Sequence, residues 1–313
     1  MNVADTHKRK ISAFSGGSTA IKDTVPERVF SVFNYIFFAL LAFLMMAPMM
    51  HLVSKSVSRE GEVLRGQVGL LPNFAGLQFE SYGMVFQNDL FWHSFFLTIK
   101  VTLIGTFVGL AVTAAAAYTL SKPYVRGRMF MLMLCIFIML FHGGLIPTYL
   151  VINGLGLTNT FTILWLTSIF SVFNMLIIKN FYETVPIEME ESARIDGAGQ
   201  FRIFALIYAP TSKAVYAVIS LFTAVTLWNN FFTAMVYTTR RDLMTLQLLL
   251  MNIIHQASDV FRDLHPDFEM MSEVTSHSVI AASVVVSTVP ILLVYPFLQR
   301  HFTKGVFLGS VKG

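Results

Sequence analysis

A polar stretch between two long apolar segments holds closely spaced ionisable residues that fit one local structure. Residues 184–201 read Thr-Val-Pro-Ile-Glu-Met-Glu-Glu-Ser-Ala-Arg-Ile-Asp-Gly-Ala-Gly-Gln-Phe. Pro186 suits the first helical position, and acids in the first turn complement the positive end of the helix dipole. Glu190 and Arg194 are four residues apart, in the order that favours a surface ion pair. Gly197 supplies the left-handed residue that ends a helix. The stretch therefore predicts a helix, a glycine and a second short helix.

The same stretch is suited to contact with another protein. Ser192 and Ala193 are small enough for a second backbone to approach closely, and the flanking acids offer polar contacts. The candidate contact residues are Glu190, Glu191, Ser192, Ala193, Asp196 and Gly197. An amphipathic connector that rests on a membrane is the alternative interpretation.

Sequence motifs for catalysis and metal binding are missing from the chain. No G-x-x-x-x-G-K-[ST] phosphate loop occurs, so we do not expect ATP to bind this chain. No G-x-S-x-G nucleophile motif occurs either. The histidines at 255, 265, 277 and 301 lack the spacing of metal ligands. We expect a non-catalytic chain without a cofactor or metal of its own.

The elements that position these residues are long apolar helices. Of the 313 residues, 55% are hydrophobic and 13% are charged, and the mean hydropathy is +0.65. Soluble domains carry about 25% charged residues, so the composition indicates a bilayer environment. Crossing its hydrocarbon core takes about 20 apolar residues. Six segments reach that length: 29–53, 92–120, 129–151, 161–182, 207–237 and 278–299. The predicted fold is an all-α integral membrane protein with six transmembrane helices.

Lysine and arginine residues predict the orientation of these helices, because cytoplasmic loops are enriched in them. Residues 54–90 carry three basic and four acidic residues, and 239–277 carry three basic and six acidic residues. The N-terminal tail, the loop after the second segment and the C-terminal end are basic. We therefore expect a cytoplasmic tail at 1–27 and a six-helix membrane domain at 28–313. Both termini and the loop 183–206 then lie inside, with 54–90 and 239–277 as external loops.

Residues Glu191–Ala198 resemble the EAA motif of permease subunits in ATP-binding-cassette (ABC) importers. That motif reads Glu-Ala-Ala, three further residues and Gly, and Ser192 here replaces the first Ala. The Asp-Gly-Ala ending and the Pro210 that follows are similar to the carbohydrate branch. Other stretches resemble the same branch: 116–122, 143–149, 154–157, 228–232, 295–300, 304–305 and 311–313. Together they resemble the second permease of the maltose-type family, and within it the oligosaccharide subgroup that includes the alginate importer.

The resemblance implies an assembly of five chains in the bacterial inner membrane. This permease would pair with a homologous second permease, two ATPase subunits and an external solute-binding protein. ATP and Mg would bind the ATPase subunits. The helix around Glu191 to Gly197 would act as a coupling helix that fits a cleft of one ATPase subunit. Because ATP acts on the other chains, this helix would convert their closure into alternating access.

Four residues in or at the ends of apolar segments are candidates for the substrate path. Lys100 is costly in a bilayer unless it faces protein or a wet cavity, where it could attract an acidic or hydroxyl-rich sugar. Asn174 and Asn229 are further polar candidates, and Trp228 could stack on a sugar ring. The alternatives are a snorkelling lysine, asparagines that bond neighbouring helices, and a tryptophan that anchors at the interface.

Three other functions remain open on the sequence. The chain could be an ABC permease for an amino acid, phosphate or a metal, although its Asp-Gly-Ala ending favours sugars. A secondary transporter would commonly show repeated halves and ionisable residues near the midplane. An integral membrane enzyme would need a nucleophile or metal constellation. Neither set of features is evident.

Overall fold

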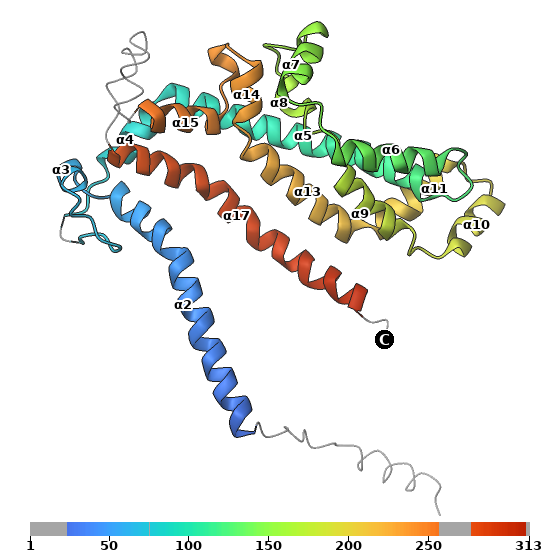
Figure 1. The fold of residues 1–313 in the computed structure, drawn as a ribbon, viewed down its shortest axis with the longest axis horizontal. Coiled ribbons are helices and arrows are strands. Elements are labelled where there is room, and N and C mark those ends of the chain that lie inside the picture. Colours follow the sequence, from blue (N-terminus) through green and yellow to red (C-terminus); the bar gives the residue numbers. More distant parts are fainter. Residues whose placement is uncertain (1–23, 75, 257–276, 311–313) are drawn as a thin grey trace, which may run out of the picture. The chain divides into compact units, whose positions relative to one another are not determined.

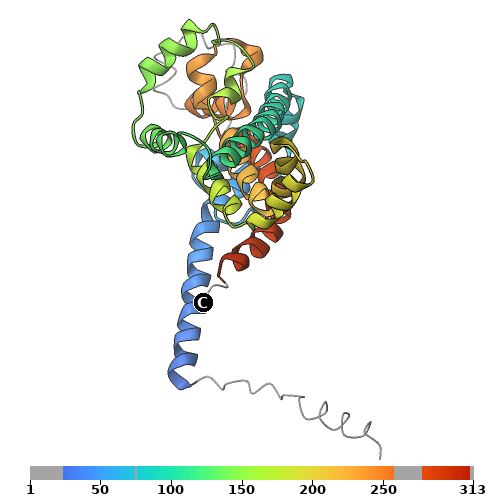
Figure 2. The same cartoon turned by 90° about the vertical axis from the view of Figure 1, so that its right-hand side faces the viewer.

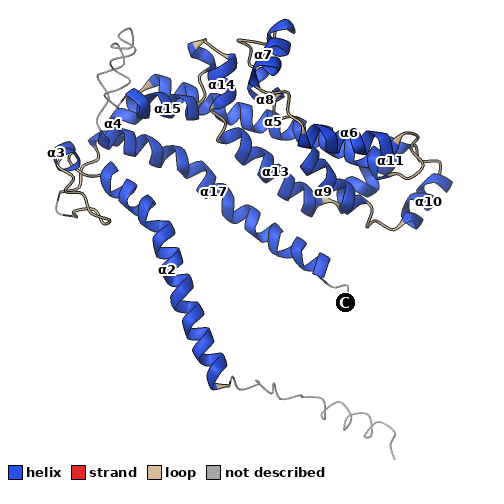
Figure 3. Ribbon diagram, in the orientation of Figure 1, coloured by secondary structure: helices blue, strands red, loops and turns tan. Residues whose placement is uncertain are grey.

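The computed structural model describes residues 24–74, 76–256 and 277–310, and regular structure there is entirely helical (Figure 3). Most elements are α-helices, whereas η2 is a π-helical turn and η3 a 3₁₀ turn. The elements are α2 (Val25–Ser56), α3 (Glu60–Leu64), α4 (Glu80–Gln87), α5 (Asp89–Ser121), α6 (Arg128–Leu140), α7 (Leu145–Gly154), α8 (Ile163–Leu166), α9 (Val172–Tyr182), α10 (Ile187–Ile195), α11 (Gln200–Ile203), η2 (Phe204–Tyr208), α12 (Ala209–Thr211), α13 (Lys213–Trp228), α14 (Phe232–Tyr237), η3 (Arg241–Leu243), α15 (Leu246–Gln256) and α17 (His277–Ser310).

The chain divides into two compact units, Met1–His51 and Leu52–Gly313. The first contains most of α2, a 32-residue apolar helix with Pro48 inside it. The carboxylate of Glu27 accepts a 2.6 Å hydrogen bond from the backbone N–H of Thr24, just before the helix begins. That bond satisfies a donor that the helix itself leaves unpaired.

The core of the second unit is built around α5, which packs against α9 and α13 (Figure 1). Gly105 and Gly109 lie four residues apart on α5, so both face the same side of the helix. A Cβ on Gly109 would lie 3.1 Å from the carbonyl oxygen of Ile169. The missing side chains let neighbouring segments approach α5 closely, as small residues do between membrane helices.

Three helices are long and apolar enough to cross a membrane: Val25–Ser56, Asp89–Ser121 and the His277–Val294 part of α17. They contain or overlap the predicted segments 29–53, 92–120 and 278–299, whose helical structure is confirmed. Within the part of the chain that the structure describes, the count rises to five only if each of two bent helix pairs forms one span. The six-span topology and the positions of the termini stay predictions.

The other three predicted segments are interrupted helices, in contrast to the continuous ones expected. In 129–151 the chain bends by 116° between α6 and α7, where Gly144 has a φ of 85° (Figure 2). In 161–182 the helix is interrupted between α8 and α9, where Ser171 has an extended backbone. The Ser171 side chain caps α9 by accepting a hydrogen bond from the backbone N–H of Asn174. In 207–237 the helices on either side of Ser212 are bent by 83°. Apolar length predicts burial in lipid or protein but not helix continuity, so these breaks escaped sequence reasoning.

Candidate functional site

The polar stretch folds as the sequence predicts. The helix α10 spans Ile187–Ile195, and Pro186 is its N-cap, one position before the place expected. Gly197 has a φ of 78°, and α11 begins at Gln200. The backbone N–H of Ala198 bonds to the carbonyl of Ala193, which closes the helix end as in a Schellman motif. The glycine is required because a left-handed φ strains any residue with a Cβ.

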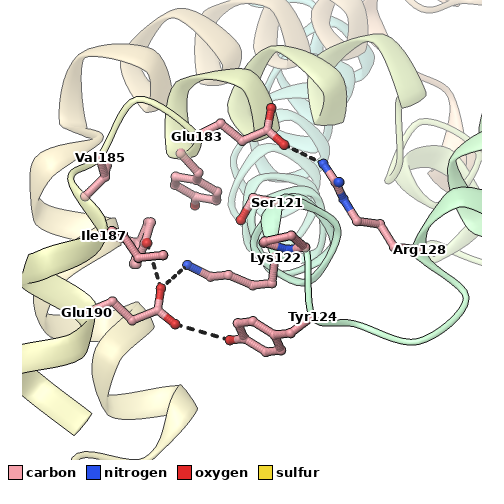
Figure 4. Close-up of a pocket in the computed structure, with 11 residues that line it drawn as sticks. Ser121, Lys122, Tyr124, Arg128, Glu183, Val185, Ile187 and Glu190 are labelled. Carbon is pink, nitrogen blue, oxygen red and sulfur yellow. Dashed lines mark hydrogen bonds and ion pairs between the residues drawn. The ribbon is translucent and has the colours of Figure 1, made fainter. Parts of the chain in front are cut away.

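Glu190 points into the protein, although the sequence placed it among the residues available to a partner. Its side chain accepts hydrogen bonds from four donors, and Figure 4 labels two of them, Lys122 and Tyr124. Lys122 Nζ and Tyr208 Oη donate to Oε2 over 2.5 Å and 2.9 Å. Arg194 and Tyr124 donate to Oε1 over 2.5 Å and 3.2 Å. We call these five residues the Glu190 cluster.

Lys122 is held in the cluster by the end of α5. It follows the last residue of that helix and is only 5% exposed. Its Nζ lies 3.6 Å from the ring centroid of Tyr208 and 4.6 Å from that of Tyr118, one turn earlier on α5. An aromatic face attracts a cation that has lost part of its water. The two rings therefore compensate in part for the burial of the ammonium group.

The environment shifts the pKa of both members of the buried pair. Burial lowers the pKa of Lys122, against the opposing effect of its bond to Glu190. Burial also works to raise the pKa of Glu190, but the bonds from Lys122 and Tyr208 outweigh it and leave that pKa below its ordinary value. A carboxylate that accepts several hydrogen bonds is stabilised in its charged form. Glu190 is therefore an ionised acceptor at neutral pH.

The start of α11 is attached to the same elements. The side-chain oxygen of Gln200 accepts hydrogen bonds from Tyr118 over 2.8 Å and from Tyr124 over 3.1 Å. Both short helices of the stretch are thus bound, through Glu190 and Gln200, to the end of α5 and the residues that follow it.

A cavity of about 270 Å³ opens beside the cluster. Its wall includes another ion pair, in which Arg128 donates to Glu183 over 2.6 Å (Figure 4). Glu183 also accepts a hydrogen bond from Lys179 over 2.8 Å. This second pair is more exposed than the first, with 28% and 36% of the Arg128 and Glu183 side chains accessible, against 6% for each partner of the Lys122–Glu190 pair. The polar groups of this site bind one another, and their bonds join α10 to the end of α5 and to η2.

Comparison with known proteins identifies the type of chain in which this site occurs. No family model matches. The polygalacturonan/rhamnogalacturonan transport system permease protein YtcP of Bacillus subtilis is 37% identical over 287 residues, 92% of this chain and 99% of the relative. Protein LplC of the same organism is 38% identical over 294 residues, covering 93% and 97%. The chain belongs to the permease family of sugar ABC importers.

Solved structures agree with this membership. A chain of a bacterial ABC transporter that imports the acidic polysaccharide alginate matches the permease with a TM-score of 0.80 and 30% identity, over 90% of this chain and 99% of that one. A chain of the bacterial alginate transporter in complex with its alginate pentasaccharide-bound periplasmic protein is 13% identical, with a TM-score of 0.52, and shows the same fold.

The permease divides the predicted coupling residues between two faces of the stretch. Glu190 is buried and Ala193 is half-buried against the core. The remaining four are exposed: Glu191, Ser192, Asp196 and Gly197. Two apolar side chains that the sequence reasoning did not select are still more exposed, Ile195 at 87% and Phe201 at 82%.

Sequence reasoning also missed the partners of Glu190. Lys122 was considered only as a basic residue near a helix end and as part of the 116–122 stretch that resembles the family, and Tyr208 was not considered. A lysine directly after a long apolar segment, four residues after Tyr118, was the available signal. It does not reveal that the acid it meets lies 68 residues later.

The four path candidates of the permease lie in different settings. Lys100 is exposed on α5, and Asn174 is half-buried at the start of α9. Asn229 is exposed, and its side chain donates to the carbonyl of Val225 over 2.9 Å. Trp228 is buried at the end of α13 and lines an apolar cavity of about 280 Å³ between α5, α13 and α17. Lys100, Asn174 and Asn229 do not line that cavity, so the structure does not gather the four candidates there.

Trp228 has one property that suits a path. Its ring packs edge-to-face on Phe95, with centroids 6.0 Å apart. Its indole N–H is buried and has no hydrogen-bond partner among the described residues. A buried unpaired donor is costly. The role of Trp228 stays a prediction.

Proposed function

We propose that this chain is the permease subunit of an ABC importer for acidic oligosaccharides in the bacterial inner membrane. It would work with a homologous second permease, two ATPase subunits that bind ATP and Mg, and an external solute-binding protein. The observation that carries the proposal is the likeness to the importer of acidic alginate, at 30% identity over almost all of that chain. The relationship to the YtcP permease supports the same substrate class.

We propose further that α10 and α11 form the contact with one ATPase subunit on the cytoplasmic side. Ile195 and Phe201 present large apolar side chains to the surroundings, next to the exposed acids Glu191 and Asp196. An exposed apolar patch bordered by polar residues is typical of a protein interaction site. The same exposed face carries small residues that let a partner approach.

Uptake into proteoliposomes tests the proposed substrate. The complete assembly, with its binding protein, is reconstituted with ATP on the ATPase side. We expect ATP-dependent uptake of oligosaccharides that contain uronic acids, and much less uptake of neutral oligosaccharides of equal length. Uptake of neutral oligosaccharides alone would contradict the acidic class. Uptake of an amino acid or phosphate in place of any oligosaccharide would contradict the sugar function.

Crosslinking tests the proposed contact. With Cys135 replaced by Ser, a cysteine in place of Ile195 should crosslink to the ATPase subunit. The matched control is a cysteine in place of Ile146 on α7, which is also highly exposed. It should give no such product. Equal crosslinking at both positions, or none at Ile195→Cys, would contradict the assignment.

A further inference from the structure

The Glu190 cluster joins parts of the chain that lie far apart in the sequence. Lys122 is 68 residues before Glu190, and Tyr208 is 18 residues after it. We propose that this cluster is the link through which a movement of α10 reaches the membrane helices, with Lys122 and Tyr208 as positioning residues. This inference rests on the proposed function and adds the route by which the ATPase contact acts on the rest of the chain.

The buried Lys122–Glu190 pair is more costly to break than the exposed Arg128–Glu183 pair. Water screens an exposed pair, and its net contribution is small. In a buried pair, removal of one partner leaves an uncompensated charge, which is strongly unfavourable. If Lys122 and Glu190 separated, each charge would either become exposed to solvent or stay buried without this partner. We therefore expect α10 and the end of α5 to move together.

The same carboxylate reaches a second membrane element. Tyr208 is the last residue of the π-helical turn η2, and its hydroxyl shares Glu190 Oε2 with Lys122. A π-helical turn interrupts regular α-helical bonding and often marks a functional position. The 83° bend before α13 follows four residues later, at Ser212. A displacement of Glu190 therefore acts on α5 directly and on α13 through the bend.

A second attachment limits rotation of the stretch about this link. Gln200 accepts bonds from Tyr118 on α5 and from Tyr124 in the following loop. Tyr118 and Lys122 are four residues apart, so they leave α5 on the same side. The two short helices are held at Glu190 and at Gln200, with the second half of α10 and Gly197 between the two points. A body that is held at two points transmits both translation and tilt.

The test measures oligosaccharide transported per ATP hydrolysed in the reconstituted complex. The variants are Lys122→Met, Glu190→Gln, their combination and Tyr208→Phe. The matched controls are Arg128→Met, Glu183→Gln and their combination, since this exposed pair lies in the wall of the same cavity but does not bind α10. Co-purification of the ATPase subunit reports assembly for every variant.

We expect Lys122→Met and Glu190→Gln each to lower the transport-to-hydrolysis ratio by at least about tenfold, because each removes the ion pair that joins α10 to the end of α5. The double variant should be no worse than the worse single one, since both changes break the same connection. Tyr208→Phe removes one hydroxyl and keeps the ring, so it should assemble normally and lower the ratio several-fold. The control variants should keep the wild-type ratio.

Three results would overturn the link: an unchanged ratio in Lys122→Met and Tyr208→Phe, additive losses in the double variant, or an equal loss in the controls. If Glu190→Gln fails to assemble, Tyr208→Phe still decides, because an assembled variant with an unchanged ratio contradicts the proposal. Failure of the proposed function is distinguishable, because the wild-type complex would then hydrolyse ATP without oligosaccharide uptake.

Discussion

Gly105 on α5 approaches Trp165 on α8 so closely that no side chain fits between them. A Cβ on Gly105 would lie 2.8 Å from the Cβ of Trp165 and 2.6 Å from a methyl group of Leu227. The leucine methyl can turn away, but the Cβ of Trp165 is fixed to its backbone. The contact therefore sets the distance between α8 and the helix at the centre of the second unit.

This contact predicts that Gly105→Ala destabilises the protein by about 1–3 kcal/mol, the usual cost of forcing extra volume into a packed contact. The measurement is thermal unfolding of the purified permease in detergent. Gly83→Ala on α4 is the matched control, because a Cβ there would meet nothing within 4 Å. It should be neutral or slightly stabilising. Equal stability of the two variants would contradict the close approach.

A bulky residue at Gly197 should reduce transport activity through backbone strain alone. A Cβ at this position meets nothing within 4 Å, but the φ of 78° costs a residue with a Cβ about 1–2 kcal/mol. We expect Gly197→Val to insert into the membrane and to lose most transport activity. Gly199→Val is the matched control, since Gly199 is equally unobstructed and has a φ of −72°. Equal transport by both variants would show that the left-handed turn is dispensable.

Thiol labelling tests the predicted orientation in the membrane. With Cys135 replaced by Ser, an impermeant thiol reagent outside intact spheroplasts should label Gly61→Cys but not Ser192→Cys. Both positions are exposed, so access depends on the side of the membrane. Permeabilised cells, in which both should react, provide the control. The reverse pattern in intact cells would place α10 on the wrong side for an ATPase contact.

The ion pair of Glu190 should give the protein an acid-dependent stability. The folded-state pKa of Glu190 lies below its ordinary value of 4.5. Its contribution is therefore complete above the unfolded-state pKa and is lost as the pH falls through the folded-state pKa. Between pH 7 and about pH 5 we expect wild type to exceed Glu190→Gln in melting temperature by a constant amount, and this difference should shrink at lower pH. A difference that grows on acidification would have the wrong sign.

The charge of Lys100 should matter only for an acidic substrate. Lys100→Met keeps a long apolar stem and removes the ammonium group. If Lys100 attracts carboxylates along the path, uptake of acidic oligosaccharides should fall while assembly and basal ATP hydrolysis stay normal. Uptake of neutral oligosaccharides, measured in parallel, should not change. Unchanged uptake of the acidic substrate would instead identify Lys100 as a snorkelling residue.

The sequence by itself determined the features that depend on local chemistry. Apolar length predicted the long helices α2, α5 and α17, because a bilayer requires about 20 such residues. Gly197 predicted the end of α10, because glycine adopts without strain the left-handed conformation that ends a helix.

Only the tertiary structure decided which way each polar residue of α10 points. Acids at 188, 190 and 191 lie on several sides of a nine-residue helix, so their spacing does not single out an inward face. Glu190 faces inward because Lys122, from a helix end 68 residues earlier, and Tyr208, from the π-helical turn, converge on the same side of α10. The breaks at Gly144, Ser171 and Ser212 were likewise not predicted, because hydropathy records only how apolar each segment is.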